Sequence, residues 1–179
     1  MKQIILLLFA MCILSFVSPA DLDGGPYSAC CGAEPVTIEI GKQNVFIPNV
    51  FTPNGDCIND VFKPFFEGSD ITIKDFVIKN NEGNKVWSID KTDPKNKNIF
   101  WHGHISKDST YTGLFHYEIT FSINDKTETT TKGSACSLVC KPNVEMQIAE
   151  KNKCFFPFQY TKDSLISTFP REVEIDCFH

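Results

Sequence analysis

The chain is 179 residues long and acidic, with 22 Asp and Glu residues against 17 Lys and Arg residues and a net charge of −5. This balance argues against nucleic acids and anionic membrane surfaces as partners, because both select basic patches. The length suffices for one domain with a sizeable hydrophobic core.

The first 20 residues have the pattern of a secretory signal peptide. Lys2 precedes an apolar run over residues 4–17, and small residues follow up to Ala20. We expect cleavage after Ala20 and export through the inner membrane, to the cell surface or medium or, alternatively, to the periplasm. The residues before Cys12 do not suit lipid attachment, and no stretch of the mature chain is apolar enough to span a bilayer.

The first half of the mature chain reads as a Gly- and Pro-punctuated segment followed by strands. Residues 36–40 alternate between apolar and polar and predict a half-buried strand, and further extended segments are predicted at 45–50, 61–66 and 70–78. Pro64 confines the segment 61–66 to a sheet edge or a bend. In the segment 70–78, the alternation slips near Lys74 and Asp75, which indicates a β-bulge.

The second half continues with strands and turns. Residues 80–84 predict a hairpin turn, and 91–98 and 106–111 predict loops. Strands are expected at 85–89, 99–104, 113–121 and 127–132. The predicted fold is therefore all-β, an antiparallel Ig-like (immunoglobulin-like) β-sandwich.

The last 38 or so residues differ from the rest in being rich in Cys and Phe. We expect a disulfide-stapled extension packed on the sandwich, in which Phe155, Phe156 and Phe158 could form an exposed patch for a partner. The expected division of the chain is a signal peptide at 1–20, an N-terminal segment with the first strand at 21–43, the sandwich at 44–141 and the extension at 142–179.

Removal of the signal peptide with Cys12 leaves seven of the eight cysteines. In an exported protein these predict disulfides, and because seven is odd, at least one thiol is free or pairs with another chain. Adjacent cysteines rarely bond to each other, so the first two should tether different elements, with Cys57 as one possible partner. The seven are Cys30, Cys31, Cys57, Cys136, Cys140, Cys154 and Cys177.

Four motifs carry a family resemblance. The segment 48–62, PNVFTPNGDCINDVF, closely resembles the opening signature of the gliding-motility-associated C-terminal domain, also called the type B sorting domain of the type IX secretion system. Residues 76–87 are similar to the hairpin of that family, 101–103 to its Trp-x-Gly element, and 113–117 to its Gly-x-Tyr-x-Tyr strand.

The resemblance implies a small, non-catalytic antiparallel β-sandwich that directs cargo across the outer membrane. Its partners would be the type IX secretion machinery or a cell-surface component. The chain departs from the family pattern in four ways. In this sequence no large cargo precedes the domain, a Cys-rich extension follows it, and Cys57 replaces a usual glycine. In addition, Lys79 to Asn84 stand where the family hairpin often carries an Arg and a further aromatic residue.

The turn within the opening motif is rich in oxygen-bearing side chains at alternate positions. Asn54, Asp56 and Asp60, with the backbone carbonyl of Ile58, could form a Ca²⁺ site, because hard cations select oxygen ligands. The alternative is a structural turn in which Asn and Asp side chains cap backbone amides.

Two histidines could in principle bind a transition metal. His102 and His104 would share one face of a strand over 101–105, a spacing suited to Zn²⁺ or Cu²⁺, but surface histidines beside a buried Trp are the better interpretation. Cys136 and Cys140 could likewise form a redox or metal pair, although structural disulfides fit an exported protein better.

An enzyme would need a nucleophile such as Cys57 or Cys140 with one of His102, His104 or His116. The sequence contains no nucleophile elbow, zinc-protease motif or phosphate-binding glycine loop, so no catalytic residue is expected. The leading hypothesis is a non-enzymatic exported protein with a sorting-like domain. The alternatives are a stand-alone Ca²⁺-stabilised surface adhesin and, from another class, a thiol-dependent or hydrolytic enzyme.

Overall fold

The computed structural model describes most of the region between the predicted signal peptide and the C-terminal extension. The described residues are 28–30, 33–55, 59–66, 70–92, 100–124, 126–139, 159–160 and 166–167. Within them, every regular element is a β-strand except a short 3-10 helix, η2 (Ser28–Cys30). The all-β prediction is confirmed.

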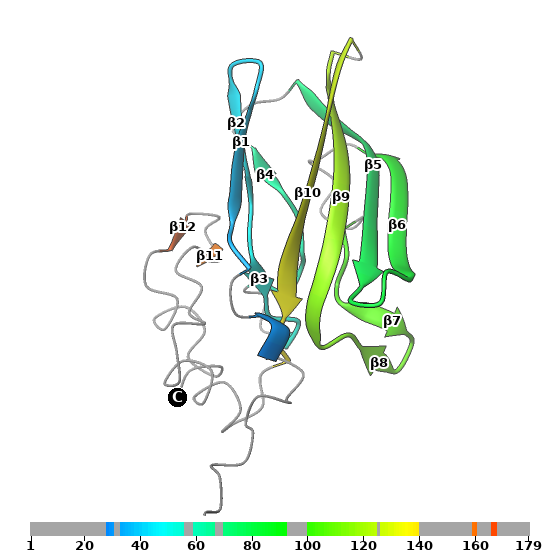
Figure 1. The fold of residues 1–179 in the computed structure, drawn as a ribbon. Helices are drawn as coiled ribbons and strands as arrows, with labels where there is room; N and C mark the ends of the chain where they lie inside the picture. The colour runs from blue at the N-terminus through cyan, green and yellow to red at the C-terminus, as the bar shows by residue number, and fades with distance from the viewer. Residues whose placement is uncertain are drawn as a thin grey trace, which may run out of the picture.

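Two sheets form the body of the fold (Figure 1). The smaller one has the order β1-β2-β4, built from β1 (Val36–Ile40), β2 (Gln43–Ile47) and β4 (Phe65–Phe66). The larger one has the order β3-β10-β9-β5-β6, built from β3 (Val50–Phe51), β10 (Thr127–Ser137), β9 (Gly113–Ile123), β5 (Ile71–Asn80) and β6 (Lys85–Thr92).

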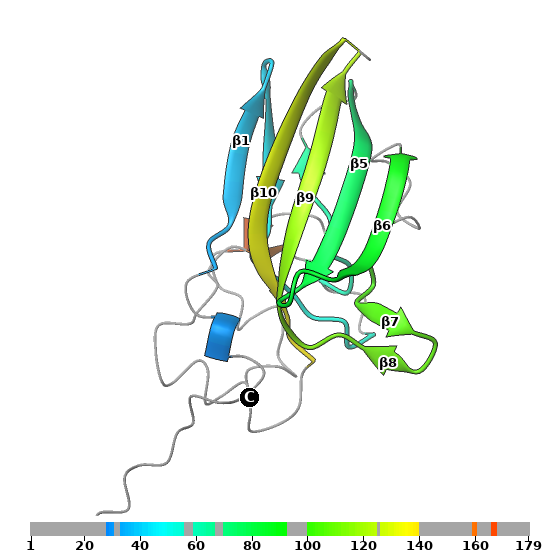
Figure 2. The same ribbon diagram turned by 45° about the vertical axis from the view of Figure 1, so that its right-hand side comes forward.

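Two small hairpin-like pairs complete the described elements: β7 (His104–Ser106) with β8 (Ser109–Thr110), and β11 (Gln159–Tyr160) with β12 (Ile166–Ser167). The two larger sheets lie as neighbouring layers in both views (Figures 1 and 2). The disulfide prediction for the extension concerns cysteines outside the described residues.

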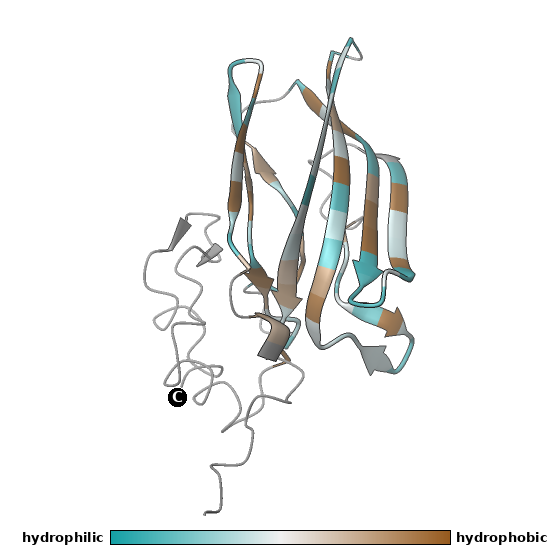
Figure 3. Cartoon of the chain, in the orientation of Figure 1, coloured by the Kyte–Doolittle hydropathy of each residue, from teal (hydrophilic) through white to brown (hydrophobic). Residues whose placement is uncertain are grey.

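The hydrophobic core lies between the two larger sheets. It combines Ile40, Val45 and Ile47 of the smaller sheet with inward-facing residues of β5 and β9. On β9 the buried and half-buried positions alternate, and this alternation appears as bands of hydropathy along the strand (Figure 3). The predicted strand at 113–121 is confirmed, and its alternation follows because a period of two places alternate side chains on one face.

One predicted strand, 45–50, is wrong as a continuous element. β2 ends at Ile47, Pro48 and Asn49 leave the smaller sheet, and β3 pairs in parallel with Cys136 and Ser137 at the edge of the larger sheet. Pro48 lacks the N–H that a continuing ladder requires, which favours the break at this point. Apart from this parallel pair, the strand pairs in the described residues are antiparallel, whereas the Ig-like topology stays a prediction.

The predicted bulge and hairpin of β5 are both confirmed. The register against β9 shifts between Ile73 and Asp75, so that one extra residue separates two inward-facing side chains. In the turn after β5, the backbone N–H of Asn84 donates to the side-chain oxygen of Asn80 at 2.8 Å. Gly83 has φ +84°, a conformation that glycine adopts without strain.

The predicted strand 99–104 and the predicted loop 106–111 are wrong. Trp101 forms only an isolated bridge with Phe62, and the chain then turns at Gly103, where φ is +78°. The strand pair β7 and β8 follows in place of the loop. β10 also runs five residues beyond the predicted end at Lys132, because its whole length pairs with β9.

Tyr117 on β9 lies against Gly133 on β10, its cross-strand partner. A Cβ atom at Gly133 would overlap the Tyr117 hydroxyl and ring, so this close approach requires glycine. The hydroxyl is buried and has no hydrogen-bond partner in the described structure. Burial also raises the pKa of Tyr117 above its ordinary value of 10.0.

Replacing Tyr117 by Phe should leave stability unchanged or raise it by about 1 kcal/mol, because a buried hydroxyl without a partner costs desolvation energy. The raised pKa means that the folded state favours the neutral phenol. Its contribution is therefore present below pH 10 and is lost as the pH rises above that value. Urea denaturation at about pH 8 and about pH 11 should show a smaller alkaline loss for the Phe variant. Strong destabilisation at the lower pH would contradict the assignment.

Candidate functional site

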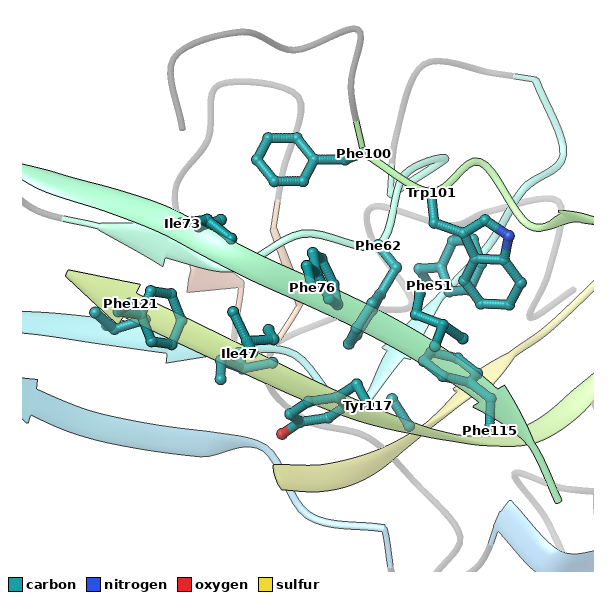
Figure 4. Packing of buried hydrophobic residues seen from close by; sticks show 14 of the residues in the cluster. Ile47, Phe51, Phe62, Ile73, Phe76, Phe100, Trp101, Phe115, Tyr117 and Phe121 are labelled. Carbon is teal, nitrogen blue, oxygen red and sulfur yellow. The ribbon is translucent and has the colours of Figure 1, made fainter. Parts of the chain in front are cut away.

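The residues that carry the family resemblance meet in space although they are spread over the sequence. Phe51 and Phe62 of the opening motif surround Phe115 of β9, with ring centroids 5.9 and 4.8 Å from it. Trp101 lies 4.9 Å from Phe115 and 5.3 Å from Phe51 (Figure 4). Three of the motifs therefore share one aromatic cluster.

The backbone fixes this cluster as well as the rings. The Phe62 N–H donates to the carbonyl of Trp101 at 2.9 Å, and the Trp101 indole N–H donates to the carbonyl of His104 at 3.1 Å. A Cβ atom on Gly103 would lie 3.1 Å from Cγ of Pro53, so the Trp-x-Gly element packs directly on the opening motif.

The loop of the predicted Ca²⁺ site is a compact turn at its two described ends. Thr52 N–H donates to the carbonyl of Asn59 at 2.9 Å, and Gly55 N–H donates to Oδ1 of Asp60 at 2.6 Å. Gly55 and Asn59 both have positive φ, at +88° and +48°. Asp60 thus caps a backbone amide, as the structural interpretation of the turn requires.

The full set of proposed Ca²⁺ ligands is not in view. Asn54 and Asp60 are described, whereas Asp56 and Ile58 lie outside the described residues. Among the residues that the structure describes, no group of three or more His, Cys, Asp or Glu side chains could hold a metal ion. The Ca²⁺ site stays a prediction.

One disulfide joins Cys30 of η2 to Cys136 of β10, with the Cα atoms 5.8 Å apart. Both residues are fully buried, in a small apolar cluster with Val50 and Leu138. Cys136 therefore does not form a redox or metal pair with Cys140. The other residues predicted to have a role lie outside the described residues. They are the cysteines Cys31, Cys57, Cys140, Cys154 and Cys177, the cleavage site at Ala20, and the aromatic residues Phe155, Phe156 and Phe158.

The histidines do not share the predicted strand. His102 precedes the turn at Gly103, and His104 begins β7 beyond it. Both are exposed at the rim of a pocket of about 370 Å³, whose apolar wall includes Trp87 and Phe100. His116 is separate, on β9, with its Nδ1 2.8 Å from Oγ of Ser134.

Comparison with known families agrees with this geometry. The family model described as CHU_C, the type IX secretion signal domain, matches residues 45–135, just over half of the chain. The chain belongs to the CHU_C family. The resemblance drawn from the opening motif is thereby confirmed. No curated protein and no solved structure gives a significant match.

Membership of the CHU_C family implies a sorting-related role in type IX secretion, an interaction with the secretion machinery, and a secreted or cell-surface location. In the described part of the chain, no helix is both long and apolar enough to cross a membrane.

The CHU_C match begins at β2, yet β1 pairs with β2 along its length and buries Ile40 in the same core.

Sequence reasoning missed a second hollow of about 370 Å³ on the CHU_C domain, across β5, β9 and β10. Its lining includes Lys79, His116 and Ser134, together with Lys132 and Glu118, which form an ion pair at 3.0 Å. The hollow depends on the register of three strands. Spacing along the sequence carries no signal for it.

Proposed function

We propose that this protein is a non-enzymatic exported protein whose CHU_C domain directs it to, or anchors it at, the cell surface or releases it into the medium by type IX secretion. The family match over residues 45–135 carries this proposal. The predicted signal peptide supplies the first step, export through the inner membrane with cleavage after Ala20.

The burial of the motif residues supports a signal that is a folded surface rather than a linear peptide. Phe51, Phe62 and Trp101 are at most 1% exposed, so a partner cannot touch them in the folded domain. Their chemistry specifies the fold, and the secretion machinery would contact the exposed residues that this fold positions.

Secretion of the full chain tests the proposal. For this test an epitope tag is inserted after Asp23, past the predicted cleavage site, and the tagged protein is expressed in a host with an intact type IX system and in one that lacks it. We expect the tag to be detected at the cell surface or in the medium only in the first host, and in the periplasm in the second. Equal release from both hosts, or retention in both, would contradict the proposal.

Absence of catalysis is part of the proposal and has a direct test. Cys30 and Cys136 are bonded to each other, so neither thiol is available as a nucleophile. A thiol-alkylating reagent applied to the folded, unreduced protein should label no cysteine at the accelerated rate that a lowered thiol pKa confers. Rapid labelling of a single cysteine would favour the thiol-dependent enzyme.

Substitutions at Asp60 distinguish structural capping of the loop from Ca²⁺ binding. Asp60→Ala should lower the free energy of unfolding by about 1 kcal/mol, because the Gly55 amide loses its acceptor. Asp60→Asn keeps an acceptor oxygen and should cost less. Thermal melting in Ca²⁺ and in a chelator completes the test. A Ca²⁺-dependent rise in melting temperature that both variants abolish would support the Ca²⁺-stabilised adhesin instead.

A further inference from the structure

The long strand β10 has an open edge. On one side it pairs with β9 over all eleven residues, but on the other only Cys136 and Ser137 pair with β3. The described structure shows no strand against residues 127–135 on that side, and β10 forms this border of the larger sheet above β3 in the view of Figure 1. An exposed strand edge presents a row of unpaired N–H and C=O groups.

One hydrogen bond shows which residues of β10 point their backbone groups toward the open edge. The Cys136 N–H donates across the edge to the carbonyl of Asn49, at 2.8 Å. Along an antiparallel strand, the N–H and C=O of alternate residues point to opposite sides. Residues 128, 130, 132 and 134 therefore direct their backbone groups to the open edge, and the residues between them bond β9.

The sequence of this edge is self-complementary in charge. Glu128-Thr129-Thr130-Thr131-Lys132 has an acid at one end, a base at the other, and threonines between them. We propose that the β10 edges of two copies of this protein pair antiparallel about a twofold axis through Thr130. Glu128 of each copy then lies directly opposite Lys132 of the other.

Backbone phase and charge select the same register. In this register Thr130 lies opposite Thr130 of the second copy, and Glu128 lies opposite Lys132. In each pair, the backbone N–H and C=O groups of both residues face the new interface, which gives about six hydrogen bonds in all. A one-residue slip would place inward-bonding residues against outward-bonding ones. Registers that align Glu128 with Glu128, or Lys132 with Lys132, oppose like charges.

The pairing also extends two side-chain rows that already cross the sheet. Lys132 Nζ lies 3.0 Å from Glu118 Oε1, so in the dimer each Lys132 stands between Glu118 of its own chain and Glu128 of the other. Thr130 Oγ1 lies 2.9 Å from Thr120 Oγ1, which makes a threonine row continuous across the axis. An isologous interface of this kind is closed and gives a dimer.

The edge lacks three common devices against pairing, namely a proline, a bulge and an inward-pointing charge, and its charged residues Glu128 and Lys132 are opposite in sign. Residues 127–135 contain no proline, and the β9–β10 register runs without a bulge. Natural edge strands commonly carry one of these devices or an inward-pointing charge. Here the inward-facing positions of the open edge include Thr129 and Thr131, which are half-buried and uncharged.

Light scattering on the purified full chain, from about 1 to 500 µM, tests the pairing. We expect a concentration-dependent dimer that weakens with added salt, because the ion pairs are exposed. Thr130→Pro should shift the protein to monomer with little change in melting temperature, since the lost N–H points to the edge and not to β9. A monomer across this range for the parent chain would overturn the proposal.

A charge exchange tests the register and does not depend on the proline variant folding. Glu128→Lys and Lys132→Glu should each weaken the affinity of dimerisation at least tenfold, because like charges then face each other. An equimolar mixture of the two should recover it, since both cross-strand pairs are again opposite in charge. Glu118→Gln is the matched control and should keep the dimer. A dimer insensitive to these changes, or no recovery in the mixture, would overturn the proposal.

Discussion

Replacing Cys30 and Cys136 together by alanine should lower the free energy of unfolding by about 4–5 kcal/mol. The bond closes a loop with a sequence separation of 106 residues, and the loss of unfolded-state entropy on closure grows with loop length. Alanine is the better replacement here, because the site is a fully buried apolar cluster in which a serine hydroxyl would need a partner.

The same bond holds the N-terminal segment against the larger sheet. Cys30 is followed closely by Ala33, whose carbonyl accepts a hydrogen bond from the Asn49 side chain at 2.9 Å. Loss of the bond should therefore loosen the point where the chain crosses from β2 to β3. Hydrogen exchange at the backbone amide of residue 136, which donates to the carbonyl of Asn49, should be faster in the double variant than in the parent.

Chemical denaturation with and without reductant measures the effect. The other cysteines also respond to reductant, so the informative quantity is the difference between parent and double variant under oxidising conditions. A loss below about 1 kcal/mol would show that the unfolded chain is already compact around these two residues. A matched Ser134→Ala variant, on the same strand, should change stability far less.

Local pattern was sufficient for much of the sheet. The alternation of β9, the slip at Lys74 and the turn after Asn80 each depend on neighbours within a few residues, and all three are confirmed. The opening motif was sufficient for the family, because its residues form the aromatic cluster that the fold is built around.

Long-range contacts set the features that the sequence did not predict. The parallel pairing of β3 depends on Cys136, far along the chain, and the break at Gly103 depends on close packing against Pro53 and Phe51. The partner of Cys30 could not be deduced, because spacing does not determine connectivity. At the site, the prediction that His102 and His104 share a strand was wrong for the same reason, because tertiary packing turns the chain between them.

Replacing Trp101 by alanine should lower the free energy of unfolding by about 3–5 kcal/mol, as for other buried aromatic side chains. Trp101 is 1% exposed and contacts Phe51, Phe115 and Tyr111, with centroid distances of 5.3, 4.9 and 5.8 Å. Its removal leaves a cavity at the point where the family motifs meet, and it also leaves the His104 carbonyl without its indole donor.

The Trp101→Ala variant links stability to secretion. If the sorting signal is a folded surface, this variant should lose surface or medium delivery, although residue 101 itself is not accessible to a partner. His102→Ala, at the exposed neighbouring position, is the matched control and should keep both stability and delivery. Trp101→Phe should fall between them, since it retains part of the ring packing. Full delivery of a Trp101→Ala chain shown to be unfolded by circular dichroism would mean that the machinery reads the chain as a linear peptide, and the folded-surface proposal would then be wrong.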